Sequence, residues 1–277
     1  MRAELRRPDT AGLPRGAFRA MGTVVSVRPG ATGPGAGAGA DADTDAALVA
    51  VADVFRRWEA TCSLFVADSE LSRVGRGELS LLDAGTDVRR AYAIALEWRL
   101  RTRGAFTPHR GDGRIDLDGV VKALAVAESG AVLDRAGATG WAIDAGGDVL
   151  VAHGPGPVWQ VGVVDPDERG ALLGGIPLGG ELGDTGPGGR RALATSGSAE
   201  RGDHIWTRPG EGPSPFRQVS VAADDIVTAD VLATAIVAGG EAALDECADR
   251  FDIDVLAVRR DGALLATPGW PRARPTG

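Results

Sequence analysis

Lysine is almost absent from this chain of 277 residues. Lysine and arginine together number 30, and Lys122 is the only lysine, so arginine carries nearly all of the positive charge. An ammonium is a compact point charge and a guanidinium is a planar fork, so the two are not interchangeable at a binding site. Lys122 is therefore either a functional ammonium or a lysine that is present by chance. The residues around it decide between these two explanations.

Long apolar runs, a basic charge excess and a cysteine framework are also missing. No run of about 18 or more apolar residues occurs, so no membrane span is expected. The net charge of −8 argues against a nucleic-acid-binding protein, which normally presents a basic face. Cys62 and Cys247 lie in helix-like patterns and are interpreted as small core residues in a reducing compartment. Residues 1–8 carry charge without an apolar segment behind them, so a cytoplasmic location is expected.

Regular alternation of strands and helices is missing as well, as is any internal repeat. The composition is that of an ordinary globular protein, with 44% hydrophobic and 25% charged residues. Runs of strands with helices between them predict an α+β domain. This domain is expected over residues 18–268, between an N-terminal arm of residues 1–17 and a Pro/Arg-rich tail of residues 269–277.

Helices are expected where apolar residues recur at helical spacing. The first is indicated by apolar residues at spacings of four, three and four, namely Val51, Phe55, Trp58 and Cys62. Either Thr44 or Asp45 is expected to cap this helix. Further helices are expected over about residues 87–103, 120–135, 229–237 and 241–250.

Strands are expected in short β-rich runs bounded by Gly and Pro. These runs are residues 23–28, 141–143, 148–151 and 158–164. Residues 167–190 are rich in Gly, Leu and Asp and are interpreted as a loop or an irregular hairpin. Near the end of the chain, Asp261 and Gly262 separate two apolar runs, which is typical of a hairpin with a type I′ turn.

A glycine-rich segment follows the first predicted strand. Gly35, Gly37 and Gly39 precede a helix, as the glycines of a dinucleotide-binding fold do. Their spacing differs from that fingerprint, and several residues separate them from the helix. A flexible surface loop is therefore favoured over a dinucleotide site.

Asp230 and Thr234 are candidates for metal binding. They are four residues apart in a predicted helix, so both oxygens project from one face. A carboxylate and a hydroxyl, completed by carbonyl, water and phosphate oxygens, suit a hard cation such as Mg2+. The alternative is that Asp230 assists a helix start and Thr234 fills the core.

The segment around the only lysine is a candidate anion site. Asp116, Asp118 and Gly119 lead from a strand-like run into a helix whose first turn carries Lys122. Free N–H groups at a helix start and an ammonium both favour an anion. The later ligands of a calcium loop are absent, so a calcium site is excluded. The alternative is an ordinary helix capped by Asp118.

Small hydroxyl residues and a histidine form a further candidate segment. Thr195, Ser196 and Gly197 can bring backbone donors close to a phosphate, and His204 can act as a general acid or base. The alternatives are an ordinary turn and a satisfied polar histidine. Ser196 lacks the elbow pattern of hydrolases, and the three histidines have no metal-ligand spacing.

Taken together and in this order, these segments resemble the ApbE family of FAD:protein FMN transferases. The resemblance covers about residues 18–240. The motifs that carry it are Ala20 to Thr23, Ser63 to Phe65, Asp68 to Arg73, Gly104 to Pro108, Ile115 to Lys122, Asp144 to Asp148, Ala194 to Gly197, His204 with Ile205, and Ala229 to Thr234.

The resemblance implies a fold and a set of site residues. The fold is a single α+β domain of the T-fold type, with antiparallel sheets and packed helices. The Mg2+ positions are the carbonyl of Gly119, Asp230 and Thr234. His204 matches a histidine that assists the chemistry. The positions around FAD are Met21, Ala105, Phe106, Thr107, Asp116, Lys122 and Ile205.

The resemblance also implies a reaction. The FMN moiety of FAD passes to a threonine of an acceptor protein, often a membrane redox protein, and AMP is released. Two alternatives share the site: a non-catalytic FAD-binding protein, and an FAD pyrophosphatase that gives FMN and AMP.

The chain departs from the family pattern at a few positions. The segment of residues 107–115 is short, and Thr107 stands where the family usually has Asp. Ala123 replaces a glycine, Asp144 replaces a common asparagine, and residues 206–209 differ from the usual Asp-Pro.

Overall fold

The structure is a computed structural model that describes residues 9–14, 16–28, 39–154, 156–168, 170–180, 189–197 and 213–271. In residues 39–45 only the backbone is described. The described helices are α1 (Gly39–Cys62), α2 (Glu70–Gly75), α3 (Thr86–Arg101), α4 (Asp118–Arg135) and α6 (Ile226–Arg250).

An antiparallel sheet forms the centre of the molecule. Its strand order is β1-β2-β3-β4-β7-β8-β9-β10, and each neighbouring pair is antiparallel. The strands are β1 (Ala17–Ala20), β2 (Thr23–Arg28), β3 (Ala142–Ala145), β4 (Asp148–Val151), β7 (Ala192–Gly197), β8 (Phe216–Ala223), β9 (Asp254–Arg259) and β10 (Leu264–Ala266). Helices and antiparallel strands in one body confirm the predicted α+β class.

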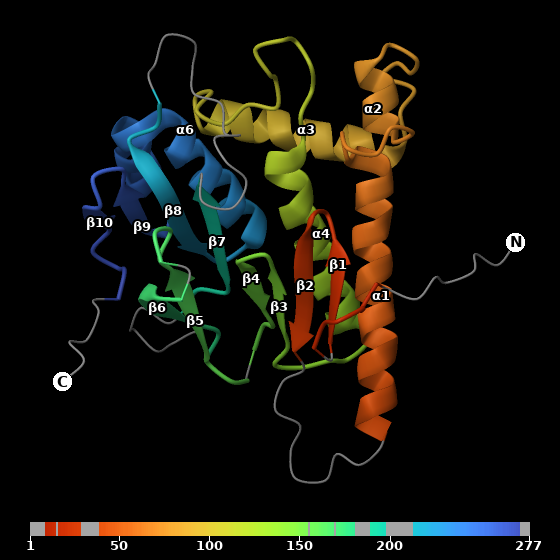
Figure 1. Ribbon diagram of the computed structural model, residues 1–277, viewed down its shortest axis with the longest axis horizontal. Helices are drawn as coiled ribbons and strands as arrows, with labels where there is room; N and C mark the ends of the chain where they lie inside the picture. The colour runs from red at the N-terminus through yellow and green to blue at the C-terminus, as the bar shows by residue number, and fades with distance from the viewer. Residues whose placement is uncertain are drawn as a thin grey trace, which may run out of the picture.

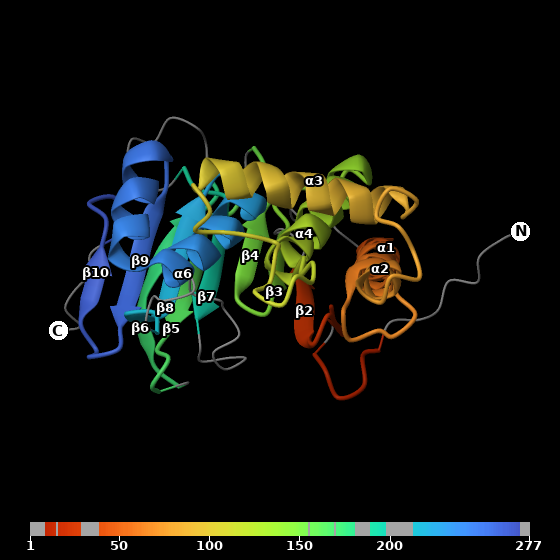
Figure 2. The ribbon, with the colours of Figure 1, turned by 90° about the horizontal axis from the view of Figure 1, so that it is seen from above.

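The two faces of this sheet have different covers (Figures 1 and 2). Helices α1, α3, α4 and α6 belong to the side of the larger apolar core. A hairpin of β5 (Trp159–Val164) and β6 (Leu172–Leu178) covers part of the second face. The smaller apolar cluster between hairpin and sheet contains Ala142, Val149, Val151, Val163, Ile176, Leu178, Leu193, Ala222, Leu256 and Trp270.

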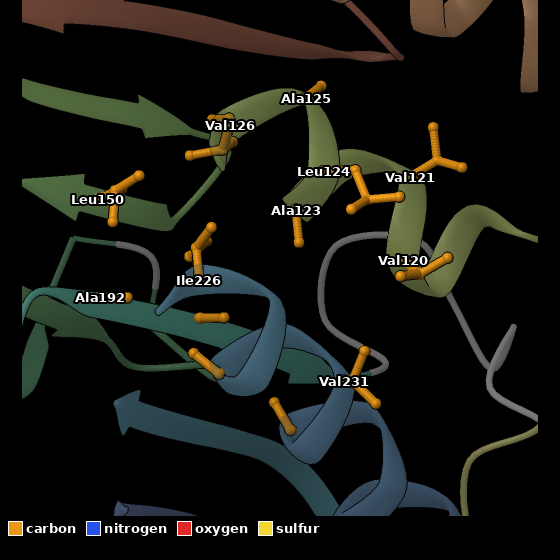
Figure 3. Packing of buried hydrophobic residues seen from close by; sticks show 14 of the residues in the cluster. Val120, Val121, Ala123, Leu124, Ala125, Val126, Leu150, Ala192, Ile226 and Val231 are labelled. Carbon is orange, nitrogen blue, oxygen red and sulfur yellow. The ribbon is translucent and has the colours of Figure 1, made fainter. Parts of the chain in front are cut away.

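Helices α4 and α6 pack on each other and on the sheet. Figure 3 shows side chains from both helices lying beside Leu150 of β4 and Ala192 of β7. Val120 on α4 and Val231 on α6 are fully buried at this contact. Each buried aliphatic side chain of this size stabilises the fold by about 1.5–3 kcal/mol. This packing fixes the first turn of α4 against the middle of α6.

Helix α1 confirms the predicted apolar stripe but not the predicted cap. Val51, Phe55 and Trp58 are fully buried. The helix begins at Gly39, so Thr44 and Asp45 lie inside it and the cap prediction is wrong. Gly35 and Gly37 lie outside the described residues.

Helix α6 joins the two helices predicted over residues 229–237 and 241–250. A kink at Gly240, where φ is +65° and ψ is −153°, separates its two parts. The helix is capped by Asp225, whose Oδ1 accepts the amide of Thr228 at 2.8 Å. By length and composition α6 could span a membrane, but most of it is buried against β7, β8 and α4. We therefore assign it as the central core helix.

The hairpin of β9 and β10 is present, but its predicted turn type is wrong. Gly262 has φ +86°, whereas Arg260 and Asp261 have no positive φ. The amide of Gly262 donates to the carbonyl of Arg259 at 3.0 Å, as in a type I turn followed by a glycine bulge. The Asp-Gly pair therefore occupies the last positions of the turn rather than its centre.

Turns with the type I′ signature occur elsewhere in the sheet. Met21 and Gly22 join β1 to β2 with φ of +50° and +71°. Gly146 and Gly147 join β3 to β4 with φ of +67° and +89°. Two positive φ values in a two-residue hairpin loop match the twist of the flanking strands. Met21 therefore adopts a backbone conformation that a non-glycine residue seldom accepts.

Strand β6 decides between two interpretations of its segment, and strand β8 was not predicted. Residues 172–178 form β6, which pairs with β5 through a register shift between Val163 and Val164, so of the two interpretations, a loop or an irregular hairpin, the structure has the hairpin. Residues 216–223 form β8, where no strand was predicted. Gln218 and Ser220 are buried in β8, and side-chain hydrogen bonds to β5 and β7 satisfy them. Buried polar residues removed the alternation that would have indicated a strand.

Both cysteines are free and buried, as the prediction of small core residues requires. Burial raises the pKa of the Cys62 thiol to about 12 and that of the Cys247 thiol to about 11. Trp270, in the predicted tail, is 6% exposed and belongs to the smaller apolar cluster. The predicted limits of the domain stay a prediction.

The turn between β3 and β4 provides a matched pair of substitutions. A Cβ at Gly146 would clash with the Thr23 hydroxyl and lie 3.1 Å from Thr23 Cβ, whereas a Cβ at Gly147 meets nothing within 4 Å. Both positions have positive φ, so alanine costs about 1–2 kcal/mol at either one. We expect Gly146→Ala to destabilise the protein by about 1–3 kcal/mol more than Gly147→Ala because of the clash. Urea unfolding midpoints measure this difference, and equal midpoints would contradict the close approach.

The raised thiol pKa values lead to a second expectation. An unfolded cysteine ionises at about pH 8.5, so the thiol contribution to stability is fully present below that pH and is lost as pH rises through the folded values. At pH 8 we expect Cys62 and Cys247 to react with Ellman's reagent only after unfolding in urea. Rapid reaction of either thiol in the folded protein would show that it is accessible.

Candidate functional site

Helix α6 carries the predicted metal-binding pair on one face. Asp230 and Thr234 are one helical turn apart, and Asp230 is only 4% exposed. A buried carboxylate needs hydrogen bonds or a positive charge, because the desolvation of an isolated charge is costly. The burial of Asp230 among the apolar residues of the first half of α6 therefore points to a polar function at this turn.

Gly119, in the first turn of α4, lies against this part of α6. A Cβ at Gly119 would be 3.9 Å from Thr234 Cγ2 and 3.0 Å from Phe106 Cε2. The second distance is tighter than most real contacts, so glycine permits the close approach of α4 to its neighbours. The structure thus brings Gly119 and Thr234 together from segments more than a hundred residues apart in the sequence.

Strand β7 adds a hydroxyl that was not assigned to the metal set. Ser196 Oγ lies 3.0 Å from Thr234 Oγ1, at hydrogen-bond distance, and Ser196 is 9% exposed. The alternative that residues 195–197 form an ordinary turn is wrong, because they are the end of β7. Periodicity could not reveal this contact, since it depends on how β7 packs under α6.

The donor chemistry of this cluster is that of a hard cation. The available groups are a carboxylate, hydroxyls and a backbone carbonyl, which are oxygen donors of the kind Mg2+ accepts. Within the described ranges, no group of three or more His, Cys, Asp or Glu side chains could hold a metal ion. A site here would therefore combine the carboxylate of Asp230 with neutral oxygens and ligand oxygens.

Lys122 lies one turn after Gly119 and forms a buried ion pair. Its Nζ is 2.7 Å from Asp148 Oδ2, and the exposed fractions of the side chains are 18% for Lys122 and 0% for Asp148. Asp148 Oδ1 accepts the amide of Thr195 at 3.3 Å. Sequence reasoning did not assign Asp148 to the site. Two features of the sequence could have indicated Asp148. It comes directly after Gly146 and Gly147, and the only lysine of the chain needs a negatively charged partner.

Asp116 organises the start of α4. Its Oδ1 accepts the amide of Asp118 at 3.0 Å, and its Oδ2 lies 3.7 Å from Arg110 Nη1. Leu117 occupies the N-cap position without a side-chain hydrogen bond, so Asp118 is the first helical residue rather than the cap. The carboxylate of Asp116 supplies the capping acceptor from one residue earlier.

The short segment of residues 107–115 folds back on itself. The amide of Asp116 donates to the carbonyl of Pro108 at 2.8 Å, and His109 forms an isolated bridge with Ile115. His109 Nε2 is 3.0 Å from the Tyr92 hydroxyl of α3, and the Thr107 hydroxyl accepts the amide of His109 at 3.2 Å. The loop is therefore held to α3 in spite of its length.

The residues before this segment pack against both helices of the site. Phe106 is 4% exposed and covers Gly119. Ala105 Cβ would lie 3.3 Å from a Cβ at Gly239 on α6. The predicted positions Ala105 and Phe106 thus form a wall beside the cluster of oxygen donors.

Met21 occupies the same end of the sheet. The turn that contains Met21 precedes β2, and the turn at Gly146 and Gly147 follows β3. Thr195 is near the end of β7. The register of the strands therefore places all of these residues at the same end of the sheet. The amide of Met21 donates to Glu59 Oε1 of α1 at 3.0 Å. The predicted residues His204 and Ile205 lie outside the described residues, as do residues 206–209.

The fold of the chain is that of solved ApbE proteins. The flavin transferase ApbE from Vibrio cholerae superimposes with a TM-score of 0.69 and 18% identity, covering 91% of this chain and 96% of that one. The ApbE protein from Thermotoga maritima gives 0.71 and 19%, with the same coverage. The apo flavinyl transferase ApbE from Pseudomonas stutzeri gives 0.68 and 15%, covering 91% and 94%. No curated protein matches the chain.

The sequence itself supports the same assignment. The model of the ApbE family matches residues 107–257, which is more than half of the chain. The chain therefore belongs to the ApbE family, and the resemblance seen in its motifs is confirmed. The matched range contains Lys122, Asp148, Ser196, Asp230 and Thr234.

The contact between Ser196 and Thr234 can be measured by a double-mutant cycle. Ser196→Ala and Thr234→Val remove one hydroxyl each, and we expect the double variant to lose about 0.5–1.5 kcal/mol less than the sum of the single losses. Thr195→Val combined with Thr234→Val is the control, because the Thr195 hydroxyl bonds Ser220 instead. Urea unfolding of all variants gives both coupling energies. Additive losses in the first pair would contradict the hydrogen bond.

Proposed function

We propose that this protein is a flavin transferase that moves the FMN moiety of FAD to a threonine of an acceptor protein and releases AMP, with Mg2+ as the metal. The supporting observation is that Thr234, which lies one helical turn after Asp230 and contacts the Ser196 hydroxyl, meets Gly119 at the start of α4, one turn before Lys122. An oxygen-donor cluster beside an ammonium suits a pyrophosphate, which needs both a hard cation and positive groups around it.

The residues present fit a magnesium ion. Asp230, the hydroxyl of Thr234 and the carbonyl of Gly119 would hold it, since they are hard oxygen donors on the facing turns of α4 and α6. When bound, Mg2+ supplies charge neutralisation at the pyrophosphate and favours the departure of AMP. The net charge of −8 makes such local neutralisation necessary for an anionic substrate.

The start of α4 would bind the phosphates of FAD. Its first amides and the ammonium of Lys122 favour an anion. Phe106 and Ala105 form an apolar wall beside this position, and the hairpin turn with Met21 closes the same end of the sheet. These residues would orient FAD so that the phosphorus on the FMN side faces the acceptor.

The transfer is a displacement at the phosphorus of the FMN half. The acceptor threonine Oγ forms a bond to that phosphorus, and the bond from phosphorus to the bridging oxygen breaks, so AMP leaves with this oxygen. The threonine proton passes to a base, and His204 is the proposed base because imidazole accepts a proton near neutral pH. Ile205 is proposed to lie beside the flavin.

The acceptor is proposed to be a protein with an exposed threonine, such as a membrane redox protein. The protein is proposed to act in the cytoplasm, and its two free, buried cysteines are compatible with a reducing compartment. Water in place of threonine would turn the same displacement into hydrolysis of FAD to FMN and AMP.

The test compares two carboxylates on the same helix. Purified protein is incubated with FAD, Mg2+ and a domain carrying a candidate threonine, and the acceptor and AMP are followed by mass spectrometry. We expect Asp230→Asn to slow FMN transfer by at least about 100-fold, because a metal ligand is worth several kcal/mol in the transition state. Asp245→Asn, at an exposed position of α6, should transfer FMN at the wild-type rate.

Each other outcome has a distinct meaning. FMN and AMP without a labelled acceptor would indicate a pyrophosphatase. Intact bound FAD under every condition would indicate a binding protein and would contradict the transferase. Equal activity of Asp230→Asn and the wild type would exclude Asp230 as a metal ligand.

A further inference from the structure

We propose that Asp148 is a positioning residue for the transfer, because it holds the ammonium of Lys122 in a fixed place relative to strand β7. This inference rests on the proposed function and adds a residue to its machinery. Asp148 itself need not touch FAD. It acts through Lys122 on one side and through the backbone of β7 on the other.

The carboxylate of Asp148 divides its oxygens between two elements. Oδ2 pairs with Lys122 Nζ of α4 at 2.7 Å, and Oδ1 accepts the amide of Thr195 of β7 at 3.3 Å. Asp148 is fully buried, so both interactions are shielded from water. A single side chain thus connects the helix that would bind phosphate to the strand that lies under α6.

The connection continues to the candidate metal site. Thr195 is followed by Ser196, whose hydroxyl lies 3.0 Å from that of Thr234. Lys122, Asp148, the end of β7 and Thr234 therefore form one chain of contacts. A shift of the ammonium relative to the donors on α6 would have to break a link in this chain.

The hairpin between β3 and β4 explains why Asp148 and no neighbouring carboxylate has this role. Asp148 is the first residue of β4 and pairs with Ala145, whose side chain belongs to the core on the helix-covered face. Asp144 pairs with Ser26 and Val149, so its side chain is on the opposite face. Its Oδ1 accepts the amide of Gly147 in its own turn.

The pair has an electrostatic consequence that separates positioning from binding. Lysine has a flexible four-carbon stem, so its charge is well placed only if a partner fixes it. Without the carboxylate of Asp148 the site would be more positive and would attract the FAD pyrophosphate at least as strongly. The ammonium would lose the ion pair with Asp148 that helps to place it where charge develops during transfer, and misplacement of a group by about 1 Å can slow a reaction about 100-fold.

The decisive variant is Asp148→Asn, with Asp144→Asn as its matched control. For Asp148→Asn we expect kcat for FMN transfer to fall by about 10-fold or more while KM for FAD is unchanged or lower. Asp144→Asn should keep the wild-type values of both constants. If Asp148 only stabilises the fold, the folded fraction of the variant should transfer FMN at the wild-type kcat, and that result would overturn the proposal. A rise in KM with an unchanged kcat would overturn it as well.

The single lysine allows a measurement that does not depend on turnover. Protein labelled with 13C at lysine Cε gives one side-chain signal, because Lys122 is the only lysine. We expect this signal to shift clearly in Asp148→Asn, which removes the direct ion pair, and to shift much less in Asp144→Asn, which removes only a longer-range charge. An unchanged lysine signal in folded Asp148→Asn would overturn the proposal that Asp148 fixes the position of the Lys122 ammonium. If the wild type transfers no FMN, the proposed function fails, and this signal alone decides whether Asp148 fixes Lys122.

A second variant covers the case in which Asp148→Asn does not fold. Asp148→Glu keeps the charge and lengthens the side chain by one methylene, so the pair can form with the ammonium displaced. We expect a kcat below that of the wild type and a shifted lysine signal. Wild-type kcat in Asp148→Glu would show that placement of the ammonium does not matter and would overturn the proposal.

Discussion

The contact between the first turn of α4 and the middle of α6 is the constraint on which the rest of the site depends. A Cβ at Gly119 would be in ordinary contact with Thr234 of α6 at 3.9 Å but would crowd Phe106 at 3.0 Å, so glycine leaves room for Phe106 beside the start of α4. The apolar residues of α4 and α6 that follow, such as Val120 and Val231, hold this geometry through burial. Oxygen donors and the only lysine are thereby placed on adjacent turns, although their segments are far apart in the chain.

Buried polar groups then give this apolar frame its chemistry. Asp148, Ser196 and Asp230 are all nearly inaccessible to water, and in such surroundings charges and hydrogen bonds interact more strongly than at a surface. A buried ion pair is weak support for stability, because desolvation offsets much of the attraction. The buried pair of Lys122 and Asp148 is therefore better explained by the placement of charge than by the stability of the fold.

The spacing of apolar residues along the sequence predicted several of the helices and strands. Periodicity predicted strand β2 and helices α3 and α4, and their observed bounds differ from the predicted ones by a few residues at most. Periodicity also predicted the apolar stripe of α1, but not where that helix begins. Strand β8 was missed because Gln218 and Ser220 are buried and satisfied by partners on other strands. The turn at Gly262 was assigned the wrong type because a dipeptide does not fix which of its residues is central.

The sequence by itself determined the α+β class, the family and the candidate residues, because short motifs in a fixed order and helical or strand periodicity are properties of the chain alone. It placed Asp230 and Thr234 on one helix face through their spacing of four residues. Only the tertiary structure decided that Ser196 meets Thr234 and that Asp148 neutralises Lys122. Those contacts depend on sheet register and on the packing of α4 and α6, and no local pattern encodes the distance between residues that fold together from remote segments.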